Sequence, residues 1–218
     1  MHPHAETLWR GPRWTLAILL AVLGMLGPFS IDTYLPAFSG IASSLNASPV
    51  HMQQTLSAYL FGFAFMNLFH GALADSFGRR PVILWGLMAF TLASLGCALA
   101  QNVTQLIVFR AMRGLSCGAG VVVSRAIVRD IFPPTQAQKV MSQITIFFGL
   151  APAIAPIMGG WLFVSLGWHS IFWLLTAIGL ALWAVNFKML PESLHASQRQ
   201  PFSIPHLMRG YWQLCTDP

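Results

Sequence analysis

The chain has 218 residues; only 8% of them are Asp, Glu, Lys or Arg, and 56% are hydrophobic. Soluble domains carry roughly 25% charged residues to cover their surfaces, so this composition argues against a water-soluble enzyme and indicates an integral membrane protein. The net charge is +6, but the basic residues are spread along the chain and do not form the compact basic surface of a nucleic-acid-binding domain.

Six apolar segments follow one another, and each is long enough to cross a bilayer as a helix. None of them alternates with period two, so a transmembrane β-barrel is excluded. Because backbone polar groups in hydrocarbon must be paired within their own segment, all six are predicted to be helices. The predicted fold is an all-α membrane bundle over residues 14–190, with residues 1–13 before it and residues 191–218 after it. The six predicted helices are residues 14–36, 51–74, 81–100, 105–128, 140–165 and 170–190.

The connections between the predicted helices alternate in charge. The loops at residues 37–50, 101–104 and 166–169 contain no Lys or Arg. Because basic loops tend to stay inside the cell, this alternation predicts that both termini are cytoplasmic. The basic residues of the other connections and of the two ends are Arg10, Arg13, Arg79, Arg80, Arg129, Lys139, Arg199 and Arg209.

The basic N-terminus followed by an apolar run is also compatible with a secretory signal peptide. The run is longer than the apolar core of such a peptide, and it carries Asp32 near its far end. We therefore interpret residues 14–36 as a retained membrane helix, with cleavage as the alternative.

Three ionisable side chains lie inside predicted spans, where a charge is costly and marks a candidate functional site. Asp32 lies about 6 Å from the outer end of the first helix, and Arg110 about 7 to 8 Å from the outer end of the fourth. Arg113 shares a helix face with Arg110. The matched depths predict a polar pathway; the alternative is a structural ion pair with arginines that snorkel toward water. Small and polar residues continue the arginine face inward: Cys117, Gly120 and Ser124.

Further polar side chains in the first two helices are candidates for the lining of a polar cavity: Tyr34, Tyr59 and Asn67. His70 shares a face with Asn67 and could titrate near neutral pH. A histidine satisfied at a helix interface is the plainer interpretation of His70, because it lies near the cytoplasmic end of its helix.

One catalytic motif needs an explanation, because residues 114–118 spell G-x-S-x-G, the nucleophile elbow of many hydrolases. An elbow requires a strand-to-helix turn, whereas these residues lie in the middle of a predicted span. An intramembrane protease would also need a histidine at the same depth, and the last span has none. The same residues read as G-x-x-x-G, a close contact between helices. We therefore expect no enzyme. Three cysteines without a C-x-x-C pair predict neither a disulfide framework nor a zinc site, and we expect no metal or other cofactor.

The loop between the second and third helices, residues 71–81, reads G-A-L-A-D-S-F-G-R-R-P. Gly71 permits close helix approach, and Gly78 permits positive φ in a tight turn. Asp75, Arg79 and Arg80 place opposite charges at the predicted cytoplasmic mouth. At every fixed position this loop resembles the signature GxLaDrxGrRxxL of the major facilitator superfamily, which implies that it gates the inner mouth.

Three other segments agree with this resemblance. Leu106-x-x-x-Arg110-x-x-Arg113 looks like the superfamily's helix 4 motif, although Arg113 stands where Gln or His is more usual. Residues 26–36, L-G-P-F-S-I-D-T-Y-L-P, are similar to the helix 1 signature of proton-driven drug exporters. Together with residues 129–131, R-D-I, the combination most resembles the bicyclomycin/chloramphenicol-resistance (Bcr/CflA) branch.

The fifth predicted helix looks like the antiporter motif of the same superfamily. Its glycines and prolines recur every three or four positions, so we expect them to line one face that bends the helix and admits another backbone. Ala155 replaces the glycine that usually precedes the second proline of the motif. The motif residues are Gly149, Pro152, Pro156, Gly159 and Gly160.

The resemblance covers residues 14–190 and implies the six-helix N-terminal half of a transporter, a 3+3 inverted repeat. It implies residence in a bacterial-type inner (plasma) membrane and export of small amphipathic, drug-like compounds in exchange for protons. Asp32 would then carry the proton, Arg110 would be its switchable partner, and Arg113 would support them. The expected partners are lipid, the substrates, and a C-terminal half or a second copy of the chain. Because the chain stops in what resembles the linker before helix 7, we do not expect these residues alone to transport.

Two other functions remain open on the sequence. A superfamily importer of sugars or carboxylates would share the fold, but the fifth-helix motif resembles exporters. A membrane interaction half-domain that does not transport would also fit a chain of this length.

Overall fold

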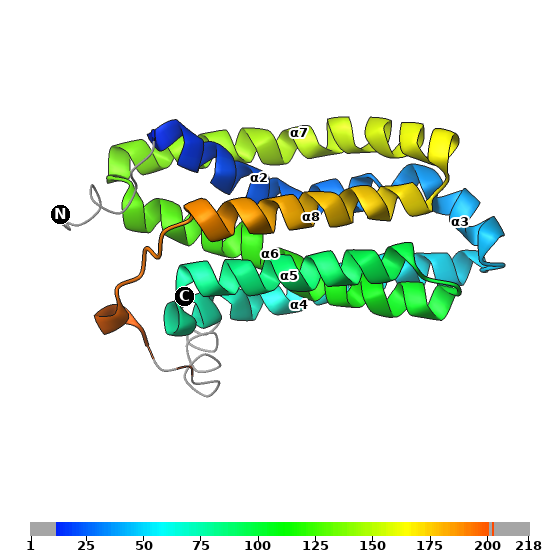
Figure 1. Ribbon diagram of the computed structural model, residues 1–218, viewed down its shortest axis with the longest axis horizontal. Helices are drawn as coiled ribbons and strands as arrows, with labels where there is room; N and C mark the ends of the chain where they lie inside the picture. Colours follow the sequence, from blue (N-terminus) through cyan, green and yellow to red (C-terminus); the bar gives the residue numbers. More distant parts are fainter. Residues whose placement is uncertain (1–11, 201, 203–218) are drawn as a thin grey trace, which may run out of the picture.

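A computed structural model describes residues 12–200 and residue 202, and this part of the chain is helical with short connections (Figure 1). Six helices are long and apolar enough to cross a membrane, which confirms the six predicted spans and the all-α fold. They are α2 (Arg13–Asp32), α4 (Pro49–Phe77), α5 (Arg79–Ala98), α6 (Val103–Ile131), α7 (Pro134–Leu166) and α8 (His169–Met189). Three short helices join them or follow: η1 (Leu35–Ala37), α3 (Phe38–Ser44) and η2 (Ala196–Gln198).

The helix ends follow local capping chemistry more closely than hydropathy. α4 begins at a proline, and the Ser48 hydroxyl accepts a hydrogen bond from the His51 amide over 3.3 Å. α6 begins after Asn102, whose Oδ1 accepts from the Gln105 amide over 2.9 Å. α7 begins at Pro134, six residues before the predicted start, because the polar residues after the proline continue the helix beyond the apolar stretch. Hydropathy therefore located the membrane-spanning parts and missed the polar extensions.

α6 is the central helix of the bundle, and it packs against α4, α5 and α2. α2 also packs against α7, and α5 packs against α8, so α4 and α7 lie on opposite sides of the bundle (Figure 1). Small residues allow these close contacts. Gly114 of α6 lies where a Cβ would collide with the carbonyl oxygen of Tyr59, and a Cβ on Gly120 would lie 2.6 Å from the carbonyl oxygen of Leu23. Residues 114–118 therefore form a helix contact in the middle of α6.

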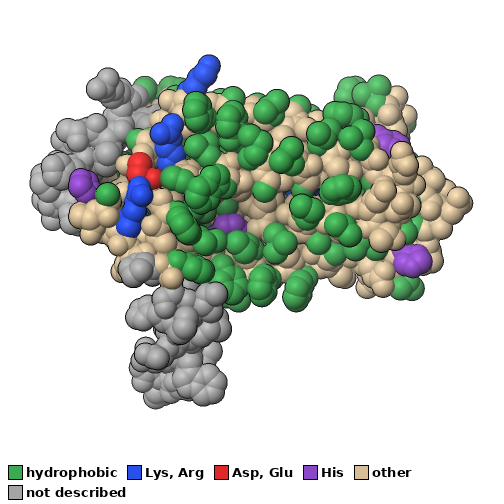
Figure 2. All heavy atoms as spheres, turned by 60° about the horizontal axis from the view of Figure 1, so that its bottom comes forward, with side chains coloured by type: hydrophobic (Ala, Val, Ile, Leu, Met, Phe, Trp, Pro, Cys, Tyr) green, Lys and Arg blue, Asp and Glu red, His purple; other side chains and the backbone are tan. Residues whose placement is uncertain are grey.

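One end of the bundle is charged, and we call it the charged end: it holds residues 75–80, 125–139 and 188–199. Acidic and basic side chains gather at this end in Figure 2, while hydrophobic side chains cover the middle of the same face. Large apolar side chains are exposed along the helices, for example Phe61, Trp161 and Val164 at 73%, 68% and 85%. This distribution is what a lipid-facing surface requires.

Candidate functional site

The interior of the bundle contains two arginines on one face of α6, and both are fully buried. The guanidinium carbon of Arg110 lies 3.6 Å from the ring centroid of Tyr34 and 5.5 Å from that of Tyr59. Its Nε donates a hydrogen bond to the carbonyl oxygen of Thr55 in α4 over 3.1 Å. Arg110 is thus held between the end of α2 and the first half of α4 by aromatic faces and a backbone oxygen.

Arg113 lies one turn further along α6 and is held in the same way. Its guanidinium carbon is 5.3 Å from the Phe172 ring centroid, 5.5 Å from that of Tyr59 and 5.8 Å from that of Phe90. Its Nη2 donates to the carbonyl oxygen of Ser30 over 3.0 Å. Ser30 lies in the last turn of α2, where carbonyls lack helical partners and the helix dipole is negative, so a cation is stabilised there.

Two pairs of hydroxyl groups fix the tyrosines against the arginines. The Tyr59 hydroxyl lies 2.8 Å from the Ser30 hydroxyl and also donates to the Gly27 carbonyl oxygen over 3.1 Å. The Tyr34 hydroxyl lies 2.8 Å from the Thr55 hydroxyl. These contacts join α2 to α4, and we call Ser30, Tyr34, Thr55, Tyr59, Phe90, Arg110, Arg113 and Phe172 the arginine cluster.

The arginine cluster holds more hydrogen-bond donors than acceptors. Nη1 and Nη2 of Arg110 and Nε and Nη1 of Arg113 are buried and have no hydrogen-bond partner in the described part of the chain. The ion pairs found among the described residues all lie at the charged end, and none includes either arginine. Because an unpaired buried charge is costly, the cluster favours the approach of a carboxylate.

Asp32 is the last residue of α2, and its side chain is partly exposed. It takes part in none of the ion pairs among the described residues, so the expected contact between Asp32 and Arg110 is not formed in this structure. The neighbouring Thr33 and Tyr34 are fully buried, and Tyr34 occupies the face of the Arg110 guanidinium instead.

The other candidates for a cavity lining are also placed inside the bundle. Tyr34 and Tyr59 are fully buried and contact the arginines, so in this structure they do not line an open cavity. Asn67 is half-buried in α4 against Gly118, where a Cβ would collide with its Oδ1. Sequence reasoning missed Ser30, Thr55, Phe90 and Phe172 because Ser, Thr and Phe are common in membrane helices and carry no distinguishing signal.

The loop between α4 and α5 forms an ion-pair network at the charged end. Arg79 contacts Asp75 over 2.5 Å through Nη1 and Asp130, at the end of α6, over 3.1 Å through Nε. The Ser193 hydroxyl, after α8, donates to the same Asp130 oxygen over 3.0 Å. Arg80 turns the other way, and its Nη2 donates to the Phe187 carbonyl oxygen over 2.6 Å. The predicted gating residues therefore connect four helices, α4, α5, α6 and α8, and the segment that follows α8.

Glu192 completes this network, and sequence reasoning did not identify it. Its two carboxylate oxygens accept hydrogen bonds from the first backbone amides of α5, those of Arg79 and Arg80, over 2.8 and 3.2 Å. A carboxylate at a helix N-terminus is favoured by the helix dipole. Gly78 makes room for it, because its φ is +105° and a Cβ there would collide with the Glu192 side chain. Gly71 is half-buried in α4, where a Cβ would be 3.8 Å from Val122.

The glycines and prolines of α7 differ in burial along the helix. A Cβ on Gly149 would meet no neighbouring atom within 4 Å, and Pro152 is exposed. Gly159 is buried instead, where a Cβ would collide with the carbonyl oxygen of Thr33. A Cβ on Gly160 would be 3.8 Å from Pro36, and Pro156 is half-buried. The buried stripe of α7 runs through Ala151, Ala155, Gly159 and Leu162, so Gly159 is the motif residue that admits another backbone within this bundle.

Comparisons with known proteins agree with this architecture. The sequence model described as Major Facilitator Superfamily matches residues 10–214. A bicyclomycin resistance protein homolog of Haemophilus influenzae is 39% identical over 194 residues, which cover 89% of this chain and 49% of that protein. The multidrug resistance protein MdtL of Escherichia coli is 35% identical over 175 residues, 80% of this chain and 45% of that protein.

Two further comparisons cover similar shares. The uncharacterized MFS-type transporter YdgK of Bacillus subtilis is 40% identical over 207 residues, 94% of this chain and 52% of that protein. The crystal structure of the human organic anion transporter MFSD10 (TETRAN) superposes with a TM-score of 0.68 at 22% identity, over 91% of this chain and 53% of that one. The chain thus spans about half the length of the curated relatives that it matches.

Proposed function

This chain belongs to the Major Facilitator Superfamily, and we propose that it forms the N-terminal half of a proton-coupled exporter of small amphipathic compounds. The names of two relatives, which refer to bicyclomycin resistance and to multidrug resistance, support this class of substrate. The half-length of the chain is consistent with the superfamily's architecture, in which substrate binds between two six-helix halves. We place the chain in the inner membrane by analogy with the superfamily, and the loop charges support an orientation with both termini in the cytoplasm.

The observation that carries the proton-coupling proposal is the arginine cluster beside an unpaired carboxylate. Four guanidinium nitrogens of Arg110 and Arg113 are buried and have no hydrogen-bond partner among the described residues. Asp32 lies two residues beyond Ser30, whose carbonyl oxygen accepts from Arg113. An ionised Asp32 is attracted to these nitrogens, and a protonated Asp32 is not. Protonation therefore changes the relative free energy of a state in which the carboxylate reaches the arginines and a state in which it does not.

A movement at the end of α2 would convert one of these two states into the other. α2 ends at Asp32, and the chain continues through η1 into α3, so residues 33–37 break the helix next to the cluster. Tyr34 covers the Arg110 guanidinium in this structure. In the proposed cycle, rotation at this break replaces the Tyr34 ring on Arg110 with the Asp32 carboxylate. Release of the proton to the cytoplasm and binding of the next one outside would then drive the exchange.

The test uses a chimera in which residues 1–218 are joined to the second half of the Haemophilus influenzae relative. Inverted membrane vesicles carrying the chimera are energised with a proton gradient, and uptake of ethidium is followed by fluorescence. We expect Asp32→Asn to abolish gradient-driven uptake, because an amide cannot carry the proton. Asp32→Glu is the matched control, since it keeps a titratable carboxylate and should retain part of the activity.

Membrane insertion of each variant is checked by immunoblotting of the vesicles, so that a loss of protein is not mistaken for a loss of coupling. If Asp32→Asn takes up ethidium at the wild-type rate under the same gradient, Asp32 is not the proton carrier.

A further inference from the structure

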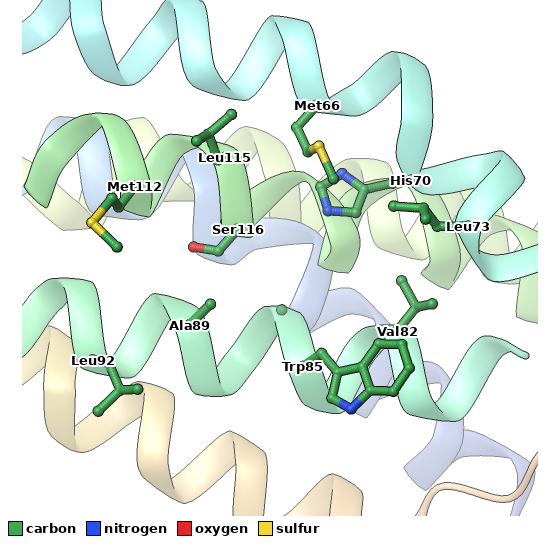
Figure 3. A pocket seen from close by; sticks show the side chains of 11 residues that line it. Met66, His70, Leu73, Val82, Trp85, Ala89, Leu92, Met112, Leu115 and Ser116 are labelled. Atoms are coloured by element: carbon green, nitrogen blue, oxygen red, sulfur yellow. The ribbon is translucent and has the colours of Figure 1, made fainter. Parts of the chain in front are cut away.

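A groove on the outer surface of the bundle lies between α4 and α5, with α6 as its floor (Figure 3). Its volume is about 470 Å³, within the usual range of ligand sites. Figure 3 shows side chains from all three helices around one space, among them Met66 and Leu73 of α4, Trp85, Ala89 and Leu92 of α5, and Met112 of α6. It lies on the outer side of α6, and the arginine cluster lies on the inner side of the same helix.

The groove exists because α4 and α5 each pack closely on α6 but touch each other little. A Cβ on Gly62 of α4 would lie 2.7 Å from the carbonyl oxygen of Ala111. A Cβ on Gly86 of α5 would lie 2.7 Å from the Cβ of Ala119. The two glycines thus bring both helices against α6 and leave an unfilled space between them.

The lining of the groove offers almost no polar group to a ligand. The Ser116 hydroxyl donates to the Arg113 carbonyl oxygen over 2.9 Å, so its donor is already used. His70 reaches the lining, but only 4% of its surface is exposed. Sites for drug-like molecules place a few polar groups to orient the ligand, and this groove lacks them. Its chemistry suits hydrocarbon better than an amphipathic compound.

The groove runs along the helices, and its length matches the thickness of one leaflet of a bilayer. Along α5 it extends from Val82 to Leu92, ten residue-to-residue steps, or about 15 Å at the helical rise. The hydrocarbon core of a membrane is about 30 Å thick, so this length matches half of it. Val82 is the fourth residue of α5, so the groove begins near the charged end and runs along the helices to the middle of the membrane. Near this end Trp85, 59% exposed, packs its ring edge against Phe77.

We propose that this groove binds one hydrocarbon chain of a membrane lipid from the leaflet at the charged end. Within a bilayer the hydrophobic effect does not favour such binding, because the surrounding lipid is equally apolar. The gain comes from dispersion contacts that an empty groove would lose. The proposal depends on the membrane-embedded fold alone and not on the proton-coupling role of Asp32.

The test is photo-crosslinking of the purified 218-residue chain in vesicles that contain a phospholipid with a diazirine in the middle of one acyl chain. Labelled peptides are identified by mass spectrometry. We expect labelling to concentrate on the groove peptides of α4, α5 and α6. Ala89→Phe fills the groove and should reduce this labelling by roughly tenfold, because many small contacts are lost together. Ala181→Phe, on the exposed face of α8, is the matched control and should leave it unchanged.

Two results would overturn the proposal. The first is labelling of the wild-type chain that is no denser in the groove than on the exposed α8 residues Trp173 and Leu180. This result does not depend on the folding of any variant. The second is groove labelling that ethidium displaces while a photoactivatable ethidium analogue labels the same peptides, which would make the groove a drug site. The acyl-chain assignment is supported if groove labelling is lost in Ala89→Phe and is unchanged both by ethidium and in Ala181→Phe.

Discussion

Two buried arginines are tolerated in this bundle because each charge faces several weak partners. The Thr55 carbonyl oxygen accepts a hydrogen bond from Arg110, and the Ser30 carbonyl oxygen accepts one from Arg113. Aromatic rings cover the faces of both guanidinium groups. A guanidinium is suited to this role because it is planar and weakly hydrated, whereas an ammonium is a compact and strongly hydrated charge. Arginine and lysine are therefore not equivalent at these positions.

Replacing Arg110 should separate its structural role from its role in coupling. Arg110→Lys keeps the charge but loses the stacking on Tyr34, so we expect a membrane-inserted protein with reduced gradient-driven uptake in the chimera. Arg110→Ala leaves a cavity and removes the hydrogen bond to the Thr55 carbonyl oxygen, so it should also lower the yield. Size-exclusion chromatography measures the folded fraction. Wild-type uptake by Arg110→Lys would contradict a coupling role.

The residues that the sequence revealed are those whose chemistry is out of place in a membrane. Asp32, Arg110 and Arg113 stand out because charged groups are rare in apolar helices, and all three lie in or next to the arginine cluster. Their arrangement could not be predicted, because it depends on where α2 ends. The break after Asp32 turns Tyr34 inward against Arg110 and leaves the carboxylate at the partly exposed surface.

At the scale of elements, the segment after α8 is docked on the loop between α4 and α5. Glu192 binds the first amides of α5, Ser193 binds Asp130, and the Gln200 amide donates to the Asp75 carbonyl oxygen over 3.1 Å. The loop signature was recognisable because its charged residues are close in sequence. Glu192 lies more than a hundred residues away from its partners, so only the fold brings them together.

Glu192→Gln should destabilise the protein by about 1–2 kcal/mol, because a neutral amide replaces a carboxylate at the N-terminus of α5. Gly78→Ala should have a similar effect, since its φ of +105° and the nearby Glu192 leave no room for a Cβ. Both variants break the same contact, so the double variant should lose less than the sum of the two effects.

Denaturant unfolding in detergent, followed by tryptophan fluorescence, measures the three free energies. Gln198→Ala, an exposed position in η2, is the control and should be neutral. Strictly additive losses would show that Gly78 and Glu192 act independently.

For the whole molecule, the charges of the loops predict which side of the membrane each loop faces. Individual contacts within the bundle carry no such information. Cysteine introduced at Asn102 should react with an impermeant maleimide added outside intact cells. Cysteine at Ser76 should react only after the membrane is opened, because the basic loop stays inside. Cys97 and Cys117 are buried and give little background, and Cys215 is replaced by Ser. The reverse labelling pattern would invert the proposed direction of proton entry.

The flanks of the whole bundle are formed by α4 and α7. These are the two least buried of the six long helices, and they lie on opposite sides of the bundle. Hydropathy could predict six helices but not which of them would have exposed flanks, because lipid-facing and protein-facing residues are equally apolar. In the superfamily's architecture a second six-helix half lies against the first, and we propose these flanks as its docking surfaces.

We predict that the 218-residue chain expressed alone inserts into the membrane, confers no drug resistance and self-associates through these flanks. Open space around Gly149 and the exposure of Pro152 make this part of α7 suitable for a close helix contact. Gly149→Trp should therefore weaken association in a cross-linking assay without unfolding the chain, whereas Ala181→Trp on α8 should not. Co-expression with the second half of the Haemophilus influenzae relative should restore resistance and suppress self-association, because both partners compete for the same surfaces. Resistance conferred by a strict monomer of these residues would refute this view, since in the proposed architecture six helices provide only one of the two walls of the path.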